Sequence, residues 1–280
     1  YMEKDSRIKY KKIEKNLGIS GNTNICFGMA TGDYIGLFDH DDILHPSVLF
    51  ESMKKICDED ADYVYICENN TIYGTKFQTL PNTKGKPLVS DQSSCFLSEP
   101  IDVSKYGVIY AGVQKNVGPA GLVIMIIRED LIRDELSFAV PTMLKWKTQV
   151  DNNSLYNTPN CFSIYICGKV FKWIKNTGGL EAMKQRNIEK ANVLYDYLDS
   201  QDFYIAPAQK DSRSIMNVTF KTKSPELDDL FVAKAKENNI VNIKGHRSVG
   251  GMRASIYNAM PKEGVIALVE FMKKFEEENK

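Results

Sequence analysis

Residues 108–127, VIYAGVQKNVGPAGLVIMII, contain two apolar runs on either side of a glycine-rich turn. The runs at 107–111 and 122–127 predict two short strands, because each is apolar and bounded by glycine. The second run is apolar on both faces, which favours a sheet covered by helices on each side. The turn contains one lysine, Lys115, just beyond the first strand.

The flanking sequence predicts an alternation of strands and helices. The predicted strands have short apolar runs, and they cover 63–66, 86–91, 214–220 and 240–243. The predicted helices have apolar residues on one face, and they cover 162–173, 183–198, 226–238 and the segment after Pro261. This order predicts an α/β fold followed by a smaller α+β domain.

The composition excludes several classes of protein. The 280 residues include 36 basic and 36 acidic side chains, so the net charge gives no reason to expect a nucleic acid or a membrane surface as partner. No run of about 18 apolar residues is present, so no membrane span is expected. Six scattered cysteines, and an opening without a signal-like apolar stretch, predict reduced thiols and a cytoplasmic protein.

Lys115 is the first candidate for chemistry. An amine in apolar surroundings loses its proton more readily than one in water, and it can then add to an aldehyde cofactor. Glycines at 112, 118 and 121 would let the backbone approach a flat ligand closely. The alternative is an ordinary surface lysine in a glycine-rich turn.

Asp91 is the second candidate, because it ends the predicted strand at 86–91. The carboxyl ends of neighbouring strands in an open α/β sheet border a common ligand crevice, so Asp91 and Lys115 are expected to face one space. A pyridine-type cofactor needs a carboxylate beside its ring nitrogen. The alternative is that Asp91 caps the next turn.

The segment 244–255, KGHRSVGGMRAS, is a candidate anion site. His246, Arg247 and Arg253 lie within eight residues of one another and are separated by paired glycines. Arginine binds carboxylate and phosphate groups through two parallel hydrogen bonds. The alternative is a solvated basic turn.

From about Ala61 to Lys280 the chain resembles the phosphoserine aminotransferase family. The stretches that carry the resemblance are NNTIYGT, LSEPIDVSKYGVIYAGVQKNVGPAGL, DNNSLYNTP, VFKWIKNTGGLEAM and KGHRSVGGMRASIYNAMPKEGV. The resemblance implies a PLP-dependent transferase of fold type I, with a partial large domain at 61–175 and a small domain at 176–280. It also implies a homodimer that exchanges an amino group between phosphoserine or 3-phosphohydroxypyruvate and glutamate or 2-oxoglutarate, in serine biosynthesis.

The same resemblance implies roles for individual residues. Lys115 is the catalytic residue and binds pyridoxal 5′-phosphate covalently. The residues implied to contact the cofactor are Thr71, Asp91, Gln114, Lys115, Asn157 and Thr158, of which Asn157 and Thr158 reach the cofactor phosphate of the neighbouring subunit. The residues implied to bind substrate are His246, Arg247 and Arg253.

Residues 1–60 resemble a different family, the family 2 glycosyltransferases of GT-A type. The motif is DYIGLFDHDD at 33–42, with NLGISGNTN before it and DILHP after it. The resemblance implies that Asp39 and Asp41 hold Mn²⁺ or Mg²⁺, which prefer carboxylate oxygens. Two alternative functions follow: a metal-dependent nucleotide-sugar glycosyltransferase, or an inactive chain formed by joining fragments of two genes.

Overall fold

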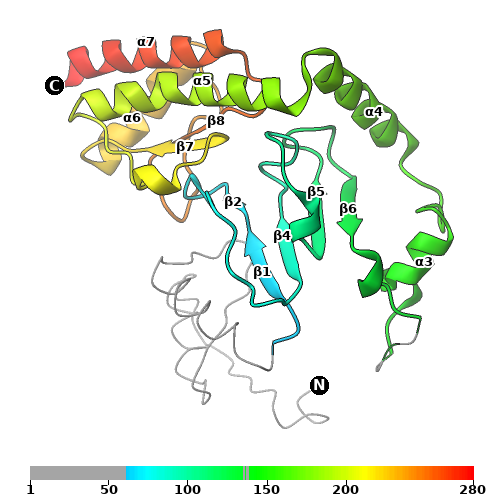
Figure 1. The fold of residues 1–280 in the computed structure, drawn as a ribbon. Coiled ribbons are helices and arrows are strands. Elements are labelled where there is room, and N and C mark those ends of the chain that lie inside the picture. The colour runs from blue at the N-terminus through cyan, green and yellow to red at the C-terminus, as the bar shows by residue number, and fades with distance from the viewer. Residues whose placement is uncertain (1–60, 135, 137–138) are drawn as a thin grey trace, which may run out of the picture. The chain divides into compact units, whose positions relative to one another are not determined.

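The computed structural model describes residues 61–134, 136 and 139–280 (Figure 1). The segment that resembles a glycosyltransferase, including Asp39 and Asp41, lies outside these residues. In the described part of the chain, no helix has both the length and the apolar character needed to cross a membrane.

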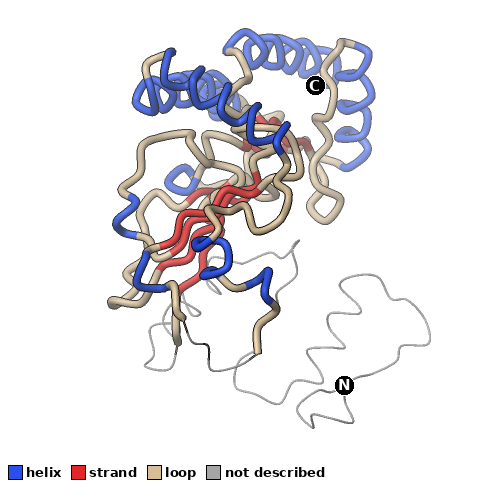
Figure 2. Tube along the Cα trace, turned by 90° about the vertical axis from the view of Figure 1, so that its right-hand side faces the viewer, coloured by secondary structure: helices blue, strands red, loops and turns tan. Residues whose placement is uncertain are grey.

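A four-stranded sheet holds the residues of the candidate site. Its strands, in spatial order, are β1 (Val64–Cys67), β4 (Leu88–Asp91), β5 (Val108–Gly112) and β6 (Val123–Ile127). The pairings of β1 with β4 and of β4 with β5 are parallel, whereas β6 runs antiparallel to β5. The strands of the sheet lie side by side in Figure 2, where they are red. All four strands lie within one or two residues of the predicted runs, which confirms those predictions.

The two faces of this sheet differ in burial. Val64, Ile66 and Ile109 are almost fully buried and pack in one hydrophobic cluster with the helix α4 (Cys161–Asn176) through Cys167. Val123, Met125 and Ile126 of β6 are 58%, 49% and 42% exposed. The prediction that both faces of this strand are covered is therefore wrong for the described residues. The physical reason is that Ile124 is the one residue of this strand that packs against the hydrophobic cluster of the sheet.

A second hydrophobic cluster surrounds a two-stranded antiparallel sheet. The sheet consists of β7 (Asn217–Phe220) and β8 (Met252–Ser255), and its helices are α5 (Gly179–Ser200), α6 (Pro225–Glu237) and α7 (Lys262–Asn279). Phe231 lies at its centre and makes edge contacts with the rings of Tyr204, Phe220, Phe271 and Phe275. These contacts explain why the apolar faces of the three helices pack against one sheet.

The prediction of a strand at 240–243 is wrong, and β8 replaces it. Met252 and Ala254 are buried while Arg253 and Ser255 are partly exposed, which is the alternation of a half-buried strand. Residues 252–255 are too short and too polar for this alternation to stand out in the sequence.

The helix boundaries follow from capping residues. Asn160 accepts a hydrogen bond from the Ser163 N–H at the start of α4, and Ser224 accepts one from the Leu227 N–H at the start of α6. Gly178 separates α4 from α5 with φ +103°, a conformation that favours glycine. A shorter helix, α3 (Trp146–Asp151), precedes α4.

A buried polar network joins the two hydrophobic clusters. Asn69 lies in the hairpin of β2 (Asn69–Asn70) and β3 (Thr75–Lys76), and its Nδ2 donates to Asn217 Oδ1 at 2.9 Å and to Ser94 Oγ at 2.8 Å. Asn258 Nδ2 donates to Leu97 O at 2.9 Å. Buried polar groups are costly unless they are paired, so these bonds fix one relative arrangement of the two clusters.

Gly74 allows this hairpin to lie close to β7. Its φ is +69°, and a Cβ there would lie 2.7 Å from Asn217 O and 2.9 Å from Thr219 Oγ1. Gly85 has a similar φ of +87°, but a Cβ on this residue would meet no other atom within 4 Å. An alanine at Gly85 would therefore suffer backbone strain alone, whereas an alanine at Gly74 would suffer backbone strain and steric crowding.

We expect Gly85→Ala to lower the free energy of unfolding by about 1 kcal/mol, the cost of a left-handed alanine. Gly74→Ala carries that cost and a further ~1–3 kcal/mol for overpacking against backbone. Urea unfolding of both variants measures the difference. Equal losses for the two variants would show that the hairpin does not press against β7.

Lys190 is a buried lysine of α5, and it predicts a pH dependence of stability. It is 2% exposed, and its Nζ donates to Tyr257 O at 2.6 Å and to Met260 O at 3.2 Å. Burial lowers the pKa of Lys190 from 10.5 to about 8. Between these two values the unfolded chain binds more protons than the folded one, so this residue makes the free energy of unfolding rise with pH.

Lys190→Met is therefore expected to flatten the rise in unfolding free energy between pH 8 and pH 10 relative to the wild type, as measured by urea unfolding at each pH. Lys172→Met, on an exposed position of α4, serves as the control and should keep the wild-type slope. If Lys190→Met also keeps that slope, burial does not perturb this amine.

Candidate active site

The turn after β5 directs Lys115 away from the core. Val113 and Val117 are buried anchors four residues apart, and the Val117 N–H donates to Val113 O at 2.9 Å. Lys115 lies between them and is half-buried. Its Nζ donates to Thr71 Oγ1 at 2.9 Å. The buried valines therefore hold the turn, and the amine has a defined position.

Thr71 lies at the tip of the β2–β3 hairpin. Asn70 Oδ1 accepts hydrogen bonds from the Ile72 N–H at 3.0 Å and from the Tyr73 N–H at 3.1 Å. The Gly74 N–H closes the turn on Asn70 O at 3.0 Å. This side-chain-supported turn fixes the threonine hydroxyl opposite Lys115.

Asp91 ends β4, in register with Cys67 of β1 and Tyr110 of β5. Register partners in adjacent strands point to the same face, so these three side chains share the partly exposed face of the sheet. Asp91 Oδ1 accepts a hydrogen bond from the Ser93 N–H at 2.8 Å. Asp91 therefore does cap the following turn with one oxygen, and it does so from the face that carries the other candidate residues.

The charges of Asp91 and Lys115 both reach Cys67. The pKa of the Cys67 thiol is raised to about 11, chiefly by partial burial and next by the Asp91 carboxylate, while the Lys115 ammonium opposes this rise. Tyr65 and Tyr110, whose hydroxyls lie 2.9 Å apart, have pKa values raised by burial and by the same carboxylate. The Asp91 carboxylate and the Lys115 ammonium thus act on the same thiol with opposite sign.

Gln114 and the pair Asn157 and Thr158 differ in their placement. Gln114 is exposed and folds back over the end of β5, since a Cβ on Gly112 would lie 2.8 Å from its Oε1. Asn157 and Thr158 are exposed in the loop between α3 and α4, and Asn157 Nδ2 donates to Thr158 O at 3.3 Å. Gln114 therefore lies in the turn of Lys115, whereas Asn157 and Thr158 lie in a separate, exposed loop.

Arg253 approaches the site from β8. It pairs in register with Thr219, whose hydroxyl donates to Tyr73 O at 2.9 Å in the turn that carries Thr71. The Arg253 Nε is buried and has no hydrogen-bond partner among the described residues. An unpartnered buried guanidinium donor is costly, so this atom is a ready partner for an anionic group.

His246 and Arg247 lie in the loop before β8. Gly245 donates to Gly251 O at 2.7 Å, and Gly250 and Gly251 have φ values of +74° and +64°. The tight closure of this loop explains the glycine at 245, because a Cβ there would overlap Gly250 O. His246 is half-buried and its Nδ1 lies 2.7 Å from Ser248 Oγ.

Sequence reasoning missed Cys67, Tyr65 and Tyr110. The signal was present, because alternate residues of the first strand are apolar and buried (Val64, Ile66) and the residues between them must face the other way. The metal prediction at Asp39 and Asp41 falls outside the described residues. Within the described ranges, no group of three or more His, Cys, Asp or Glu side chains could hold a metal ion.

Comparisons with known proteins identify the family. The sequence profile of the aminotransferase class-V family matches residues 40–268. The phosphoserine aminotransferase of Desulfatibacillum aliphaticivorans is 54% identical over 223 residues, which are 79% of this chain and 62% of that protein. The chain thus spans about three fifths of the length of the curated relatives that it matches. The comparisons do not support the glycosyltransferase resemblance, and the class-V match already begins at residue 40.

Solved structures agree with the sequence match. The phosphoserine aminotransferase of Bacillus circulans subsp. alkalophilus has 47% identity and a TM-score of 0.77, over 79% of this chain and 62% of that one. The PLP-bound phosphoserine aminotransferase of Trichomonas vaginalis has 43% identity and a TM-score of 0.73, over 77% and 61%. The fold is that of a type I PLP-dependent transferase, and the chain belongs to the aminotransferase class-V family.

Proposed function

We propose that this protein is a pyridoxal 5′-phosphate-dependent phosphoserine aminotransferase of cytoplasmic serine biosynthesis. The observation that carries the proposal is the hydrogen bond of the Lys115 amine to the Thr71 hydroxyl, together with electrostatic effects of Lys115 and Asp91 on the same thiol, Cys67. The identity to phosphoserine aminotransferases over 79% of the chain supports the same assignment.

The residues present fit this cofactor. An amine held at a fixed position suits covalent attachment to an aldehyde, and a carboxylate on the same face suits a protonated ring nitrogen. Lys115, Asp91, Thr71 and Gln114 would hold the cofactor in this chain. The cofactor supplies an aldehyde and an electron-withdrawing ring.

The protein's own residues supply binding and proton transfer. Lys115 Nζ would take a proton from the reacting carbon of the substrate and return it to the product. The Thr71 hydroxyl, 2.9 Å away, orients this nitrogen. The Asp91 carboxylate would hold a proton at the ring nitrogen, and its own position is fixed by the Ser93 N–H.

The anionic ends of the substrates would be bound by the basic residues of the β7–β8 region. The unpartnered Arg253 Nε suits the α-carboxylate, which is common to phosphoserine and glutamate. His246 and Arg247, in the closed loop before β8, suit the phosphate of one substrate and the side-chain carboxylate of the other. This division explains how one site could accept both substrates.

We also infer two domains, at 61–175 and 176–280. The two hydrophobic clusters support this division, because the buried members of one come from residues 64–167 and those of the other from residues 191–275. The network of Asn69 and Asn217 connects them.

A homodimer is the third part of the proposal. The helix α4 exposes Phe162, Tyr165 and Ile164 at 68%, 61% and 46%, and the preceding loop exposes Leu155 and Tyr156. Phe162 and Tyr165 lie three residues apart and share one face of the helix, and exposed large apolar side chains grouped on one face are typical of a protein–protein interface. Asn157 and Thr158 lie in this loop, in a position suited to serving a second copy's site.

Borohydride reduction tests the role of Lys115. After incubation with pyridoxal phosphate and reduction, we expect the label on the peptide that contains Lys115, as found by mass spectrometry. Lys115→Ala should lose the label on this peptide and lower the rate of amino transfer from glutamate to 3-phosphohydroxypyruvate by about 10²–10⁴-fold, the usual contribution of a general acid–base group.

Lys105→Ala is the matched control, since Lys105 is an exposed lysine only ten residues away in the sequence. It should keep both the label and the rate. A label spread evenly over surface lysines would refute the assignment of Lys115, whereas a labelled enzyme that transfers no amino group to 3-phosphohydroxypyruvate would refute the substrate.

Charge on the face of α4 tests the dimer. The double variant Phe162→Glu/Tyr165→Glu is expected to sediment as a monomer, because it places carboxylates in an interface that buries apolar area. Val241→Glu changes an equally exposed apolar residue, at 64%, outside this surface and should stay dimeric. Sedimentation of the double variant as a dimer would contradict this interface.

A further inference from the structure

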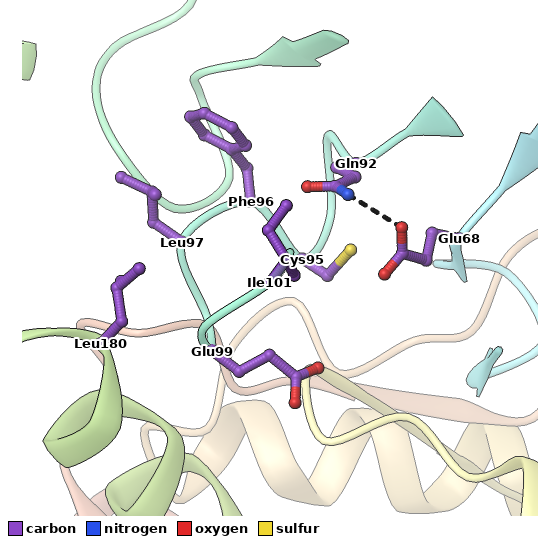
Figure 3. Close-up of a pocket in the computed structure, with 8 residues that line it drawn as sticks. All are labelled: Glu68, Gln92, Cys95, Phe96, Leu97, Glu99, Ile101 and Leu180. Atoms are coloured by element: carbon purple, nitrogen blue, oxygen red, sulfur yellow. Dashed lines mark hydrogen bonds between the residues drawn. The ribbon is translucent and has the colours of Figure 1, made fainter. Parts of the chain in front are cut away.

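Glu68 is a buried acid that the proposed function does not use. It follows β1 directly and is 5% exposed. Its Oε2 accepts hydrogen bonds from Ser90 Oγ at 3.0 Å, Gln92 Nε2 at 2.8 Å and Tyr106 OH at 3.0 Å. Figure 3 shows the Gln92 amide directed at this carboxylate. Burial of a carboxyl group is costly, and three donors to one oxygen offset that cost.

Two of these donors flank Asp91 in the sequence. Ser90 and Gln92 are 0% and 2% exposed and point toward the buried side of the sheet, where Glu68 holds both of them. Alternation along the strand then directs Asp91 to the opposite, open face. The backbone is held as well, because the Glu68 N–H donates to Asp91 O at 3.0 Å and the Gln92 N–H donates to Tyr110 O at 2.9 Å.

A small cavity lies on the same buried side. Its volume is about 30 Å³, and its lining includes Glu68, Gln92 and Cys95 together with apolar side chains (Figure 3). Loss of the Glu68 side chain would enlarge this space and leave the Gln92 amide without its acceptor. The amide could then turn, and the residues on both sides of Asp91 would lose their common anchor.

We propose that Glu68 is a positioning residue, whose hydrogen bonds to Ser90 and Gln92 fix the Asp91 carboxylate on the open face of the sheet, in register with Cys67. The use of this position by a cofactor rests on the proposed function, but the position itself does not. The test therefore has one part without cofactor and one part with it.

The first part measures alkylation of Cys67, which is an exposed thiol, in the protein without cofactor. The Asp91 charge raises the pKa of this thiol, so displacement of the carboxylate should lower that pKa. We expect Glu68→Ala to raise the alkylation rate at pH 8 about threefold, the gain in thiolate from a fall of about half a pKa unit. Peptide mapping separates Cys67 from the other cysteines.

The decisive comparison is the same substitution in the Asp91→Asn background. The Glu68 charge also raises the pKa of Cys67 directly, so Glu68→Ala should raise the rate to a small extent in both backgrounds. If Glu68 also acts through Asp91, the rise is larger when Asp91 is present. An equal change in both backgrounds would overturn the proposal, because the direct effect of the Glu68 charge would then account for all of it. Glu68→Gln removes the charge but keeps an acceptor oxygen, so it should show the small direct effect alone; a rise as large as that of Glu68→Ala in this variant would also overturn the proposal.

Tyr106→Phe is the matched control for stability. It removes one donor to the same oxygen, but Tyr106 does not adjoin Asp91, so the Cys67 rate should not change. If Glu68→Ala does not fold, Ser90→Ala removes a single hydrogen bond beside Asp91 and should raise the Cys67 rate in the same Asp91-dependent way. No rise in Ser90→Ala would then refute the role of Glu68.

The second part measures the dissociation constant of pyridoxal phosphate by absorbance titration. Glu68→Ala should weaken binding about tenfold with Asp91 present and leave it unchanged in Asp91→Asn. A wild-type protein that binds no cofactor would refute the proposed function, and the Cys67 rates would still decide the role of Glu68. Wild-type binding that Glu68→Ala leaves intact would refute the positioning role alone.

Discussion

The parallel pairing of β1, β4 and β5 is the constraint on which the site depends. Parallel strands end at one edge of a sheet, so the segments that follow them meet there: the hairpin with Thr71, the turn after Asp91 and the turn with Lys115. The register matters as much as the direction. A slip of one residue between β4 and its neighbours would turn Ser90 to the open face and bury Asp91 among apolar side chains.

The position of the Thr71 hairpin against β7 is fixed by buried hydrogen bonds as well as by apolar packing. Apolar clusters tolerate small shifts, but a buried amide such as that of Asn69 loses much of its bonding energy when its partner moves. The bond to Asn217 therefore fixes the hairpin of Thr71 against β7. Arg253 lies on the adjacent strand, so one network determines the separation between the amine and the guanidinium.

The sequence was sufficient to predict the four strands of the larger sheet and the residues at the ends of β4 and β5 that could carry chemistry. Lys115 and Asp91 could be found because glycines and strand termini mark them locally, whereas Thr71 was identified only by resemblance. The partly exposed state of β6 depends on which side chains elsewhere in the chain pack against it, which no local pattern encodes. Asn69 and Asn217 are 148 residues apart and Glu68 and Gln92 are 24 apart, so both contacts arise from the tertiary fold.

Lys115 and Asp91 carry opposite charges, and each has a neutral hydrogen-bond partner. Lys115 donates to a hydroxyl and Asp91 accepts from a backbone N–H, while the Cys67 thiol responds to both charges. A direct ion pair would neutralise both groups, and a ligand would first have to break it. Separate neutral partners keep both groups oriented and leave the amine and the carboxylate free to engage opposite ends of one ligand. This arrangement suits a flat molecule that has an electrophilic carbon at one position and a basic nitrogen at another.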